Sequence, residues 1–186
     1  MIICVICARG GSKRLIGKNR ALFLGKPLIV RCVETCMAFG FDDVVVSTDD
    51  EEIANLAHDS GAIIRHRNAE LAADDTPKAY ALRDAVVWYE QKCRSEVEFV
   101  FSVQANSPGI TVELIERVKD RLIHGYGEVS TIFSNLVQNP AVRAFSRKNL
   151  FDDFYSTYSA AVIFDGEDVH TKQDLLAAEL QVKDGG

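Results

Sequence analysis

The chain has 186 residues, of which 47% are hydrophobic and 26% are charged, and this is the size of one ordinary globular domain. A formal net charge of −6 at pH 7 argues against general nucleic-acid binding, because proteins that bind a duplex usually carry a basic face. No run approaches the roughly 18 apolar residues of a membrane span, and no basic region precedes the short apolar run at the N-terminus. We therefore expect a cytoplasmic protein with neither a membrane anchor nor a signal peptide.

A buried strand is predicted at residues 2–7, and a basic, glycine-containing loop follows it directly at residues 8–19. Gly10 and Gly11 in this loop allow another molecule to approach the backbone closely. The loop contains four cations within a stretch of ten residues: Arg9, Lys13, Arg14 and Lys18. Exposed N–H groups and clustered positive charge suit a polyanion such as a nucleotide triphosphate, although a solvated surface turn is the alternative. The loop matches neither the Walker A pattern nor the Gly-x-Gly-x-x-Gly fingerprint.

Helices and strands alternate along the rest of the chain. Helical spacing of apolar residues predicts helices at 28–39, 51–60, 78–94, 111–124 and 172–180. Apolar and β-branched runs predict strands at 42–48, 62–64, 98–103, 129–133 and 160–164. This alternation predicts an α/β fold, a three-layer α/β/α sandwich with a Rossmann-like, mostly parallel sheet, in a single domain of residues 1–186.

Residues 134–158 form the least regular part of the chain and include Asn139-Pro140. Two interpretations remain open for this segment. It is either a small excursion from the sheet that contacts a second subunit or an ordinary surface loop.

Several polar segments directly follow predicted strands. They are the loop 8–19, Ser47-Thr48-Asp49 and residues 104–107. Ligands of open α/β sheets bind beyond the carboxyl ends of the strands, so we expect these segments to share one cleft. Asp49 and Asp50 are equally well explained as acids that begin a helix.

The five cysteines are an odd number and lie mostly in apolar patterns: Cys4, Cys7, Cys32, Cys36 and Cys93. A four-thiolate zinc site is one interpretation. Cys4 and Cys7 lie in one predicted strand, where alternate residues face opposite ways, and this favours buried, reduced thiols.

Four segments, in the same order along the chain, resemble the cytidylyltransferases that activate acidic sugars, the CMP-sialic acid and CMP-KDO synthetases. The first is the loop 8–19 with Gly25-Lys26-Pro27, and the second is residues 46–54. Residues 67–77 are similar to the family's Arg-Pro-x-Glu-Leu-Ala-x-Asp segment, and residues 103–108 to its Leu-Gln-x-Thr-Ser-Pro loop. The resemblance extends over residues 1–120 and implies a fold of the nucleotide-diphospho-sugar transferase type.

This resemblance implies that the anomeric hydroxyl of a sugar acid attacks the α-phosphorus of CTP, and that pyrophosphate leaves with the help of Mg²⁺. It also implies a homodimer. The implied catalytic residues are Arg9, Lys18 and Asp168. The implied nucleotide-binding residues are Ala8, Arg9, Gly10, Gly11, Ser12, Lys18, Asn19 and Arg67. The residues implied to face the sugar are Gln104, Asn106 and Ser107.

The carboxyl-terminal third departs from the family. Asp168 fills the first position of an Asp-x-Asp magnesium segment, whereas His170 takes the second, and an imidazole is a poorer magnesium ligand than a carboxylate. His170 is equally well explained as a surface histidine. Gly109-Ile110 replaces the family's Leu-Arg, and an Arg-Pro-Asn-Gly segment is missing unless residues 155–160 replace it. A nucleotide-binding protein without activity and an enzyme that uses GTP or another sugar acid are therefore the alternatives.

Overall fold

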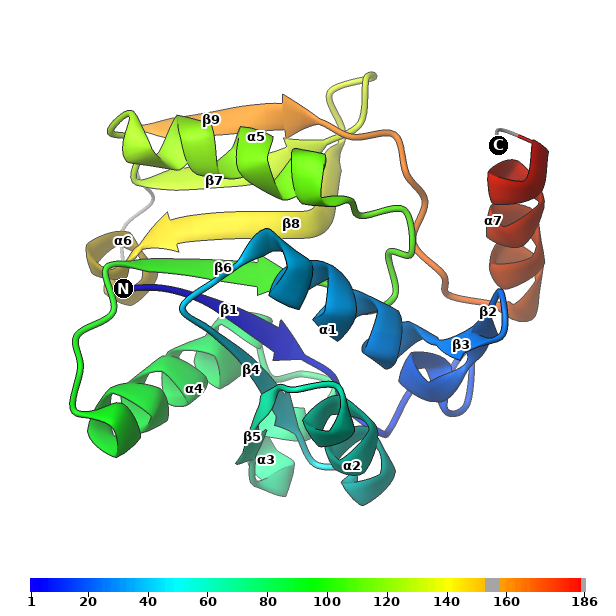
Figure 1. Ribbon diagram of the computed structural model, residues 1–186, viewed down its shortest axis with the longest axis horizontal. Coiled ribbons are helices and arrows are strands. Elements are labelled where there is room, and N and C mark those ends of the chain that lie inside the picture. Colours follow the sequence, from blue (N-terminus) through cyan, green and yellow to red (C-terminus); the bar gives the residue numbers. More distant parts are fainter. Residues whose placement is uncertain (153–157, 185–186) are drawn as a thin grey trace.

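The structure is a computed structural model that describes residues 1–152 and 158–184. Within these residues seven strands form one sheet in the order β5-β4-β1-β6-β8-β7-β9 (Figure 1). The strands are β1 Ile2–Cys7, β4 Asp43–Thr48, β5 Ile63–His66, β6 Phe99–Val103, β7 Glu128–Ile132, β8 Gln138–Ser146 and β9 Ser159–Ile163. A two-stranded ribbon, β2 Leu22–Phe23 with β3 Lys26–Pro27, lies outside this sheet.

The sheet is mostly parallel, as the alternation of elements predicts. β1 pairs in parallel with both β4 and β6, β4 with β5, and β7 with β9. Parallel neighbours need a crossover connection, which the helices supply. β1, β4 and β6 therefore end at one edge, and the segments that follow them meet there.

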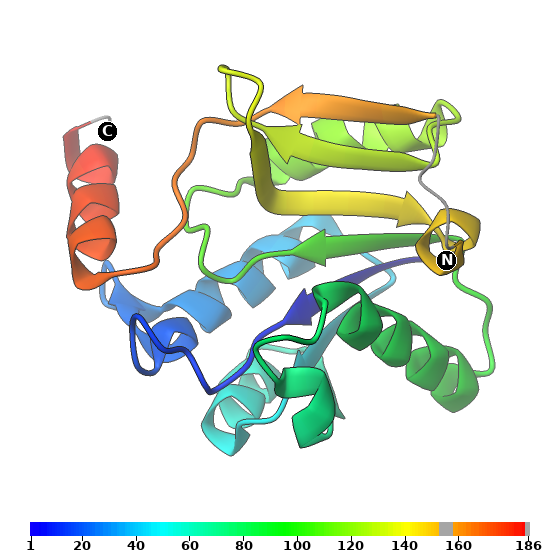
Figure 2. The same ribbon diagram turned by 180° about the vertical axis from the view of Figure 1, so that it is seen from behind.

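Helices cover both faces of the sheet, which confirms the three-layer architecture (Figures 1 and 2). Alternate residues of β1 show the two faces: Cys4 and Ile6 belong to one core, Ile3 and Val5 to the other. The first core is completed by α1 Leu28–Phe39, α2 Glu51–Asp59 and α5 Val112–Ile123. The second is completed by α4 Lys78–Cys93 and α6 Arg147–Phe151.

The last helix, α7 Lys172–Asp184, lies apart from the sheet and close to the β2–β3 ribbon (Figure 1). A small core joins Ala178 of this helix to Phe23, Leu28 and Val169. The N–H of Leu24 donates to Oε1 of Glu179 over 2.7 Å. None of the helices in the described part of the chain is long and apolar enough to cross a membrane.

The expectation that residues 134–158 are irregular is wrong for residues 138–146. These residues form β8, which lies inside the sheet and runs antiparallel to both β6 and β7. The register between β7 and β8 shifts between Ser130 and Ile132, where the buried Thr131 hydroxyl donates to the carbonyl of Asn139 over 2.6 Å. Two further short helices occur where loops were expected, α3 Ala69–Ala72 and a 3₁₀ turn at Lys18–Arg20.

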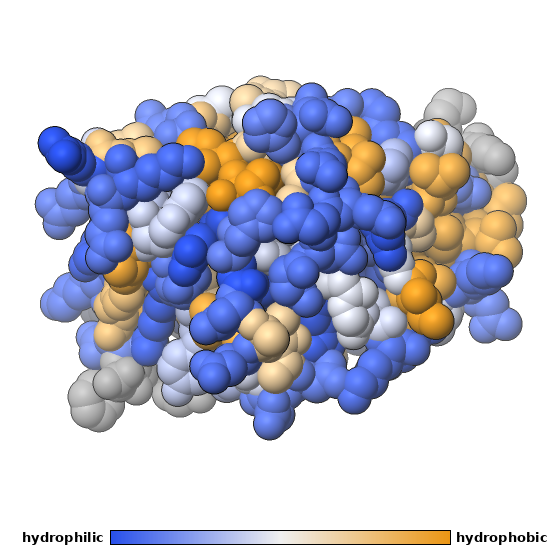
Figure 3. Space-filling model, turned by 90° about the horizontal axis from the view of Figure 1, so that it is seen from below, coloured by the Kyte–Doolittle hydropathy of each residue, from blue (hydrophilic) through white to orange (hydrophobic). Residues whose placement is uncertain are grey.

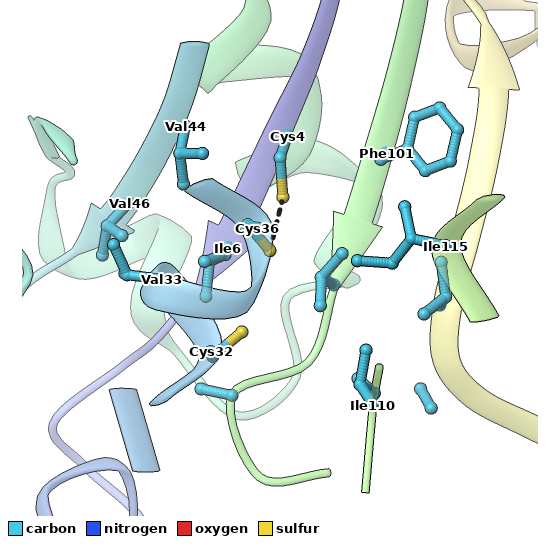
Figure 4. Close-up of a cluster of buried hydrophobic side chains, with 14 of the residues drawn as sticks. Cys4, Ile6, Cys32, Val33, Cys36, Val44, Val46, Phe101, Ile110 and Ile115 are labelled. Carbon is cyan, nitrogen blue, oxygen red and sulfur yellow. Dashed lines mark hydrogen bonds between the residues drawn. The ribbon is translucent and has the colours of Figure 1, made fainter. Parts of the chain in front are cut away.

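Three thiols are buried between β1 and α1, at Cys4, Cys32 and Cys36 (Figure 4). The Sγ atoms of Cys4 and Cys36 are 3.6 Å apart, and burial raises the pKa of the Cys4 thiol. All five cysteines are free. Among residues 1–152 and 158–184, no group of three or more His, Cys, Asp or Glu side chains is placed to hold a metal.

Candidate active site

A cavity of about 480 Å³ opens beyond the carboxyl ends of β1, β4 and β6. Two of the three segments expected to share a cleft line it, the loop 8–19 and residues 104–107. Ser47-Thr48-Asp49 does not line the cavity, although Asp49 contacts Gly10 and Arg67 from outside it. Its polar lining residues come from the loop 8–19, from the α3 region and from the strand ends: Arg9, Ser12, Lys13, Arg14, Lys18, Asn19, Arg67, Asp74, Thr76, Lys78, Gln104, Asn106 and His170. The outer face below it, formed by α2, α3 and α4, is mostly hydrophilic (Figure 3).

The loop after β1 is held against the start of α2. The N–H of Ala8 donates to the carbonyl of Ser47, and the N–H of Gly10 donates to Oδ1 of Asp49 over 3.2 Å. A Cβ atom on Gly10 would lie only 2.5 Å from Oδ2 and 2.9 Å from Cβ of Asp50. Glycine at position 10 is therefore required by the close packing of the loop on the residue that caps α2.

Asn19 fixes the other end of the same loop. Its side chain is buried, and its Nδ2 donates to the carbonyl of Arg9 over 3.0 Å. Gly17, just before it, takes a φ of 67°, in the left-handed region that favours glycine. Ser12 also lines the cavity, whereas Ala8 is fully buried and supports the loop from below.

Two of the cavity's cations are balanced by one carboxylate, Asp74. Arg9 Nη2 lies 2.6 Å from Asp74 Oδ1, and Lys13 contacts the other oxygen. The hydrogen bond from Lys13 holds the pKa of Asp74 below its usual value. Arg9 Nη1 also donates to the carbonyl of Ala72 over 3.3 Å, which ties the loop to α3.

Two further cations, Lys18 and Lys78, are differently placed. Neither side chain has a hydrogen bond or ion pair with any residue that the structure describes. Lys18 is half-buried, whereas Lys78 is exposed and lines the cavity. Desolvation by the protein around each ammonium group lowers the pKa of both lysines, and the charge of Asp168 partly opposes that shift.

Arg67 is the most buried cation of the cavity, with 9% of its surface exposed. Its Nη2 lies 3.7 Å from Asp49 Oδ1, and its Nε has no hydrogen-bond partner among the described residues. A buried donor without a partner costs about 1 to 3 kcal/mol. Arg67 lines the same cavity as Lys18 and Lys78, so three cations meet there.

Asp168 and His170 reach the same edge from the segment before α7. Ser107 Oγ donates to Asp168 Oδ1, and His170 Nε2 lies 4.0 Å from Asp168 Oδ2. The backbone of Val169 is held by Asn106, whose carbonyl accepts its N–H over 2.7 Å. The loop 104–107 therefore positions Asp168, and the 3% exposed Ser107 holds that carboxylate.

Asp168 could hold magnesium only together with the phosphates of a bound substrate. Mg²⁺ is commonly held by one or two carboxylates together with substrate phosphates, and Asp168 supplies one carboxylate beside the cationic cavity. His170 also lines the cavity, and its backbone N–H donates to the carboxylate of Asp174 over 2.8 Å. Its imidazole is a poor magnesium ligand.

A second cavity of about 600 Å³ lies on the α4 side of the sheet. Lys78 and Gln104 line both cavities, so the two spaces meet at these residues. Gln104 is oriented by its Nε2, which donates to the carbonyl of Pro140 over 2.8 Å. The remaining polar lining includes Ser102, Glu128, Arg143 and Asn149.

Several cavity residues were not identified from the sequence. Lys78 is one of them, although its place directly after the motif segment 67–77, at the first position of α4, was a usable signal. Arg143 was missed because the strand that carries it was not predicted, and Ser102 because its strand was predicted without the neighbour, β8, that stands beside it. Residues 155–157 of the proposed replacement segment lie outside the described residues.

Comparison with known proteins identifies the family of this chain. The family model described as Cytidylyltransferase matches residues 3–178. Pseudaminic acid cytidylyltransferase of Campylobacter jejuni is 34% identical over 125 residues, which are 65% of this chain and 53% of that protein. A CMP-N,N'-diacetyllegionaminic acid synthase of Legionella pneumophila is 38% identical over 92 residues, 48% of this chain and 40% of that protein. The chain thus spans about half the length of the curated relatives it matches.

Solved structures agree on the fold. A CMP:2-keto-3-deoxy-manno-octonic acid synthetase complexed with CTP superposes with a TM-score of 0.75 at 16% identity, covering 100% of this chain and 99% of that one. Rv0371c of Mycobacterium tuberculosis, in complex with manganese, gives a TM-score of 0.68 at 14% identity, covering 96% and 98%. At such identities the likeness shows the architecture alone.

Proposed function

Because this chain belongs to the cytidylyltransferase family, we propose that it transfers CMP from CTP to an acidic sugar and releases pyrophosphate. The anomeric hydroxyl oxygen of the sugar forms a bond to the α-phosphorus, and the bond from that phosphorus to the pyrophosphate oxygen breaks. The observation that carries the proposal is the cavity at the carboxyl ends of β1, β4 and β6, where Lys18, Arg67 and Lys78 converge.

The loop residues bind the triphosphate. Arg9 and Lys18 neutralise its charge, and Lys18 has no competing protein anion in hydrogen-bond contact. Gly11, with no atom within 4 Å of its Cβ position, leaves the backbone open to the phosphates, while Ala8, Gly10, Ser12 and Asn19 shape the loop. Stabilising the charge that develops on the phosphates is the main chemical task, because phosphoryl and nucleotidyl transfer need positioning more than a protein nucleophile.

The acceptor enters through the second cavity. Gln104, at the junction of the two cavities, faces both substrates, and Asn106 and Ser107 hold the loop that carries this junction. The names of the relatives favour a nonulosonic acid such as pseudaminic or legionaminic acid, or a 3-deoxy-manno-octulosonate, as the acceptor.

We propose Mg²⁺ as the metal, held by Asp168 together with the phosphates of CTP. When bound, the metal supplies positive charge to the phosphates and thereby assists the departure of pyrophosphate. Asp168 is kept in place by the hydroxyl of Ser107. His170 is assigned no metal-binding role beyond its position at the rim.

Incubation of the purified protein with each NTP, Mg²⁺ and a panel of sugar acids, followed by measurement of pyrophosphate release, tests this function. We expect release with CTP and an acidic sugar. Release with GTP alone would show that the assignment of CTP as the nucleotide is wrong. CTP binding by calorimetry without release for any pair would favour a nucleotide-binding protein without activity, the reading that Gly109-Ile110 and His170 suggest.

We also propose that the protein acts as a homodimer in the cytoplasm, where CTP is made. The segment 134–158 contributes the exposed side chains of Leu136 and Val137, which are 75% and 56% exposed, to the proposed dimer contact. Sedimentation of the wild-type protein and of a Leu136→Ser variant tests the dimer, and a monomeric wild type would refute it.

A further inference from the structure

A polar row crosses the sheet on the face that α4 covers. Ser102 of β6 stands directly opposite Arg143 of β8 in the strand register. Two pairs further along, on the same face, Val100 and Phe145 stand opposite each other and belong to the apolar core under α4. The row therefore begins where that core stops, and it forms part of the wall of the second cavity.

The helix that covers this core does not extend over the row. Figure 2 shows α4 lying over β1 and β4, with β8 and β7 open on the same side up to α6. Helix α4 packs on β1, β4 and α6. The polar row is thus left facing the cavity rather than a helix.

Two buried polar atoms in this row have no hydrogen-bond partner among the residues that the structure describes. They are Oγ of Ser102, a residue that is 3% exposed, and Nε of Arg143. Each unmade hydrogen bond of a buried group is costly, and a buried row of this kind would be more stable if it were apolar. Two such atoms therefore lie side by side on one wall of the cavity.

The guanidinium of Arg143 has contacts that fix its position but do not occupy all its hydrogen-bond donors. Its Nη2 contacts the carboxylate of Glu128, and its Cζ atom lies 5.0 Å from the centroid of the Phe145 ring. These two contacts fix the plane of the guanidinium, which offers five donors in all. The Arg143 side chain is 39% exposed and lines the cavity, so an anion there can reach the N–H groups that Glu128 does not occupy.

The charge around the cavity also favours an anion. Its charged lining residues are the cations Lys78, Arg83 and Arg143 and the acids Glu128 and Asp152. Arg83 is anchored on the cavity rim by donating to the carbonyls of Leu150 and Asp152. Lys78 stands at the junction with the first cavity, so an anion bound in the second cavity lies beside the nucleotide.

We propose that Arg143 binds the carboxylate of the acceptor and that Ser102 hydrogen-bonds a neighbouring polar group of it, so that this pair determines which acceptors the protein accepts. The inference rests on the proposed function and names the residues that would select the acidic substrate. It also gives a role to a serine and an arginine that stand opposite each other beside the apolar core under α4.

The test compares Arg143→Lys, which keeps the charge but loses the planar fork, with Ser102→Ala and with the control Arg147→Lys. Arg147 is a matched control because it also pairs with a glutamate, Glu90, and also lies over a phenylalanine ring, that of Phe151, outside the cavity. The KM for the sugar acid and the KM for CTP are measured separately, and thermal unfolding checks that each variant is folded.

We expect the KM for the sugar acid to rise about ten- to a hundredfold in Arg143→Lys, the range for losing a charged hydrogen bond, with the KM for CTP unchanged. Ser102→Ala should raise the KM for the sugar acid about two- to tenfold. Arg147→Lys should change neither. An unchanged KM for the acceptor, or an equal rise in the KM for CTP, would overturn the assignment.

A binding experiment separates failure of this inference from failure of the proposed function. If the wild type releases no pyrophosphate, N-acetylneuraminate and its methyl ester are titrated into the CTP-bound protein by calorimetry. Binding of the acid but not of the ester, lost in Arg143→Lys and kept in Arg147→Lys, supports the carboxylate site although the enzyme activity fails. Equal binding of acid and ester, or no binding of either, overturns the inference.

Discussion

Replacing Lys18 by methionine keeps most of the side-chain volume but removes one positive charge from the cavity that the loop 8–19 lines. The described residues offer this ammonium group no hydrogen bond or ion pair, and its partial burial already lowers its pKa. The triphosphate of CTP would therefore be its first close partner. Loss of a hydrogen bond to a charged group costs about 1.5 to 3 kcal/mol, so Lys18→Met should weaken CTP binding about ten- to 150-fold.

Lys13 provides the contrast, because it lines the same cavity but is 80% exposed and already contacts Asp74. An exposed ion pair of this kind contributes about 0 to 1 kcal/mol, so Lys13→Met should weaken CTP binding by no more than about fivefold. Lys26→Met, at an exposed pair with Glu34 outside the cavity, is the control.

Isothermal titration of CTP into the three variants, without sugar acid and at fixed salt, measures these differences. The wild-type affinity should also fall as pH rises toward the ordinary lysine value of 10.5, because a lowered pKa means that Lys18 loses its proton earlier. Binding should then take up protons, since the anion favours the charged ammonium form. Equal losses in Lys18→Met and Lys13→Met, or an unchanged affinity in Lys18→Met, would refute the assignment of Lys18 to the phosphates.

Three further predictions concern the loop, the carboxylate and the thiols. Gly10→Ala should lower the free energy of unfolding by about 1 to 3 kcal/mol, because its Cβ would overlap Asp50, while Gly11→Ala, with no atom within 4 Å, should change it by less than about 0.5 kcal/mol in urea titrations. Asp168→Asn, which can still accept from the Ser107 hydroxyl, should reduce turnover at limiting Mg²⁺ on the order of tenfold or more with little change in the unfolding midpoint, and an unchanged rate would exclude it from the metal site. The folded-state pKa of the Cys4 thiol is raised above its unfolded value of 9.0, so its contribution to stability is complete below pH 9 and is lost as pH rises further; Cys4→Ala should show a shallower alkaline loss, and an identical slope would contradict this.

The part of the fold that forms the nucleotide cavity could be predicted from the sequence. β1, β4 and β6 are continuous apolar runs because parallel strands are buried on both faces, and such runs stand out from their surroundings. Once three parallel strands are placed, the segments after them must lie at one edge. The convergence of the loop 8–19 with Gln104 and Asn106 follows from that geometry.

β8 could not be predicted because its sequence resembles a loop. Asn139-Pro140 reads as a turn, and Arg143 breaks the apolar run that a central strand usually shows. Pro140 is tolerated because it lies opposite the irregular register between Ser130 and Ile132, where regular ladder pairing is interrupted. Arg143 is tolerated because the cavity, not a helix, lies over it.

Lys78 shows a different limit of sequence reasoning. In the sequence it is an ordinary polar residue at the first position of a helix, after Pro77. Its role depends on Gln104 and Arg143, which are distant along the chain and reach the same space only through the order of the strands. Pairings of this kind are set by tertiary structure, and no local pattern indicates them.

The reversed direction of β8 brings the start of this strand, rather than its end, to the edge where β6 finishes. The carbonyl of Pro140, which orients Gln104, and the side chain of Arg143 consequently belong to one short stretch of chain that is separate from the loop 8–19. On the proposed assignment of Arg143, substitutions in this one strand would alter acceptor choice while the residues of the loop 8–19 stay unchanged. Such a division would let relatives diverge in the sugar they activate without having to rebuild their use of CTP.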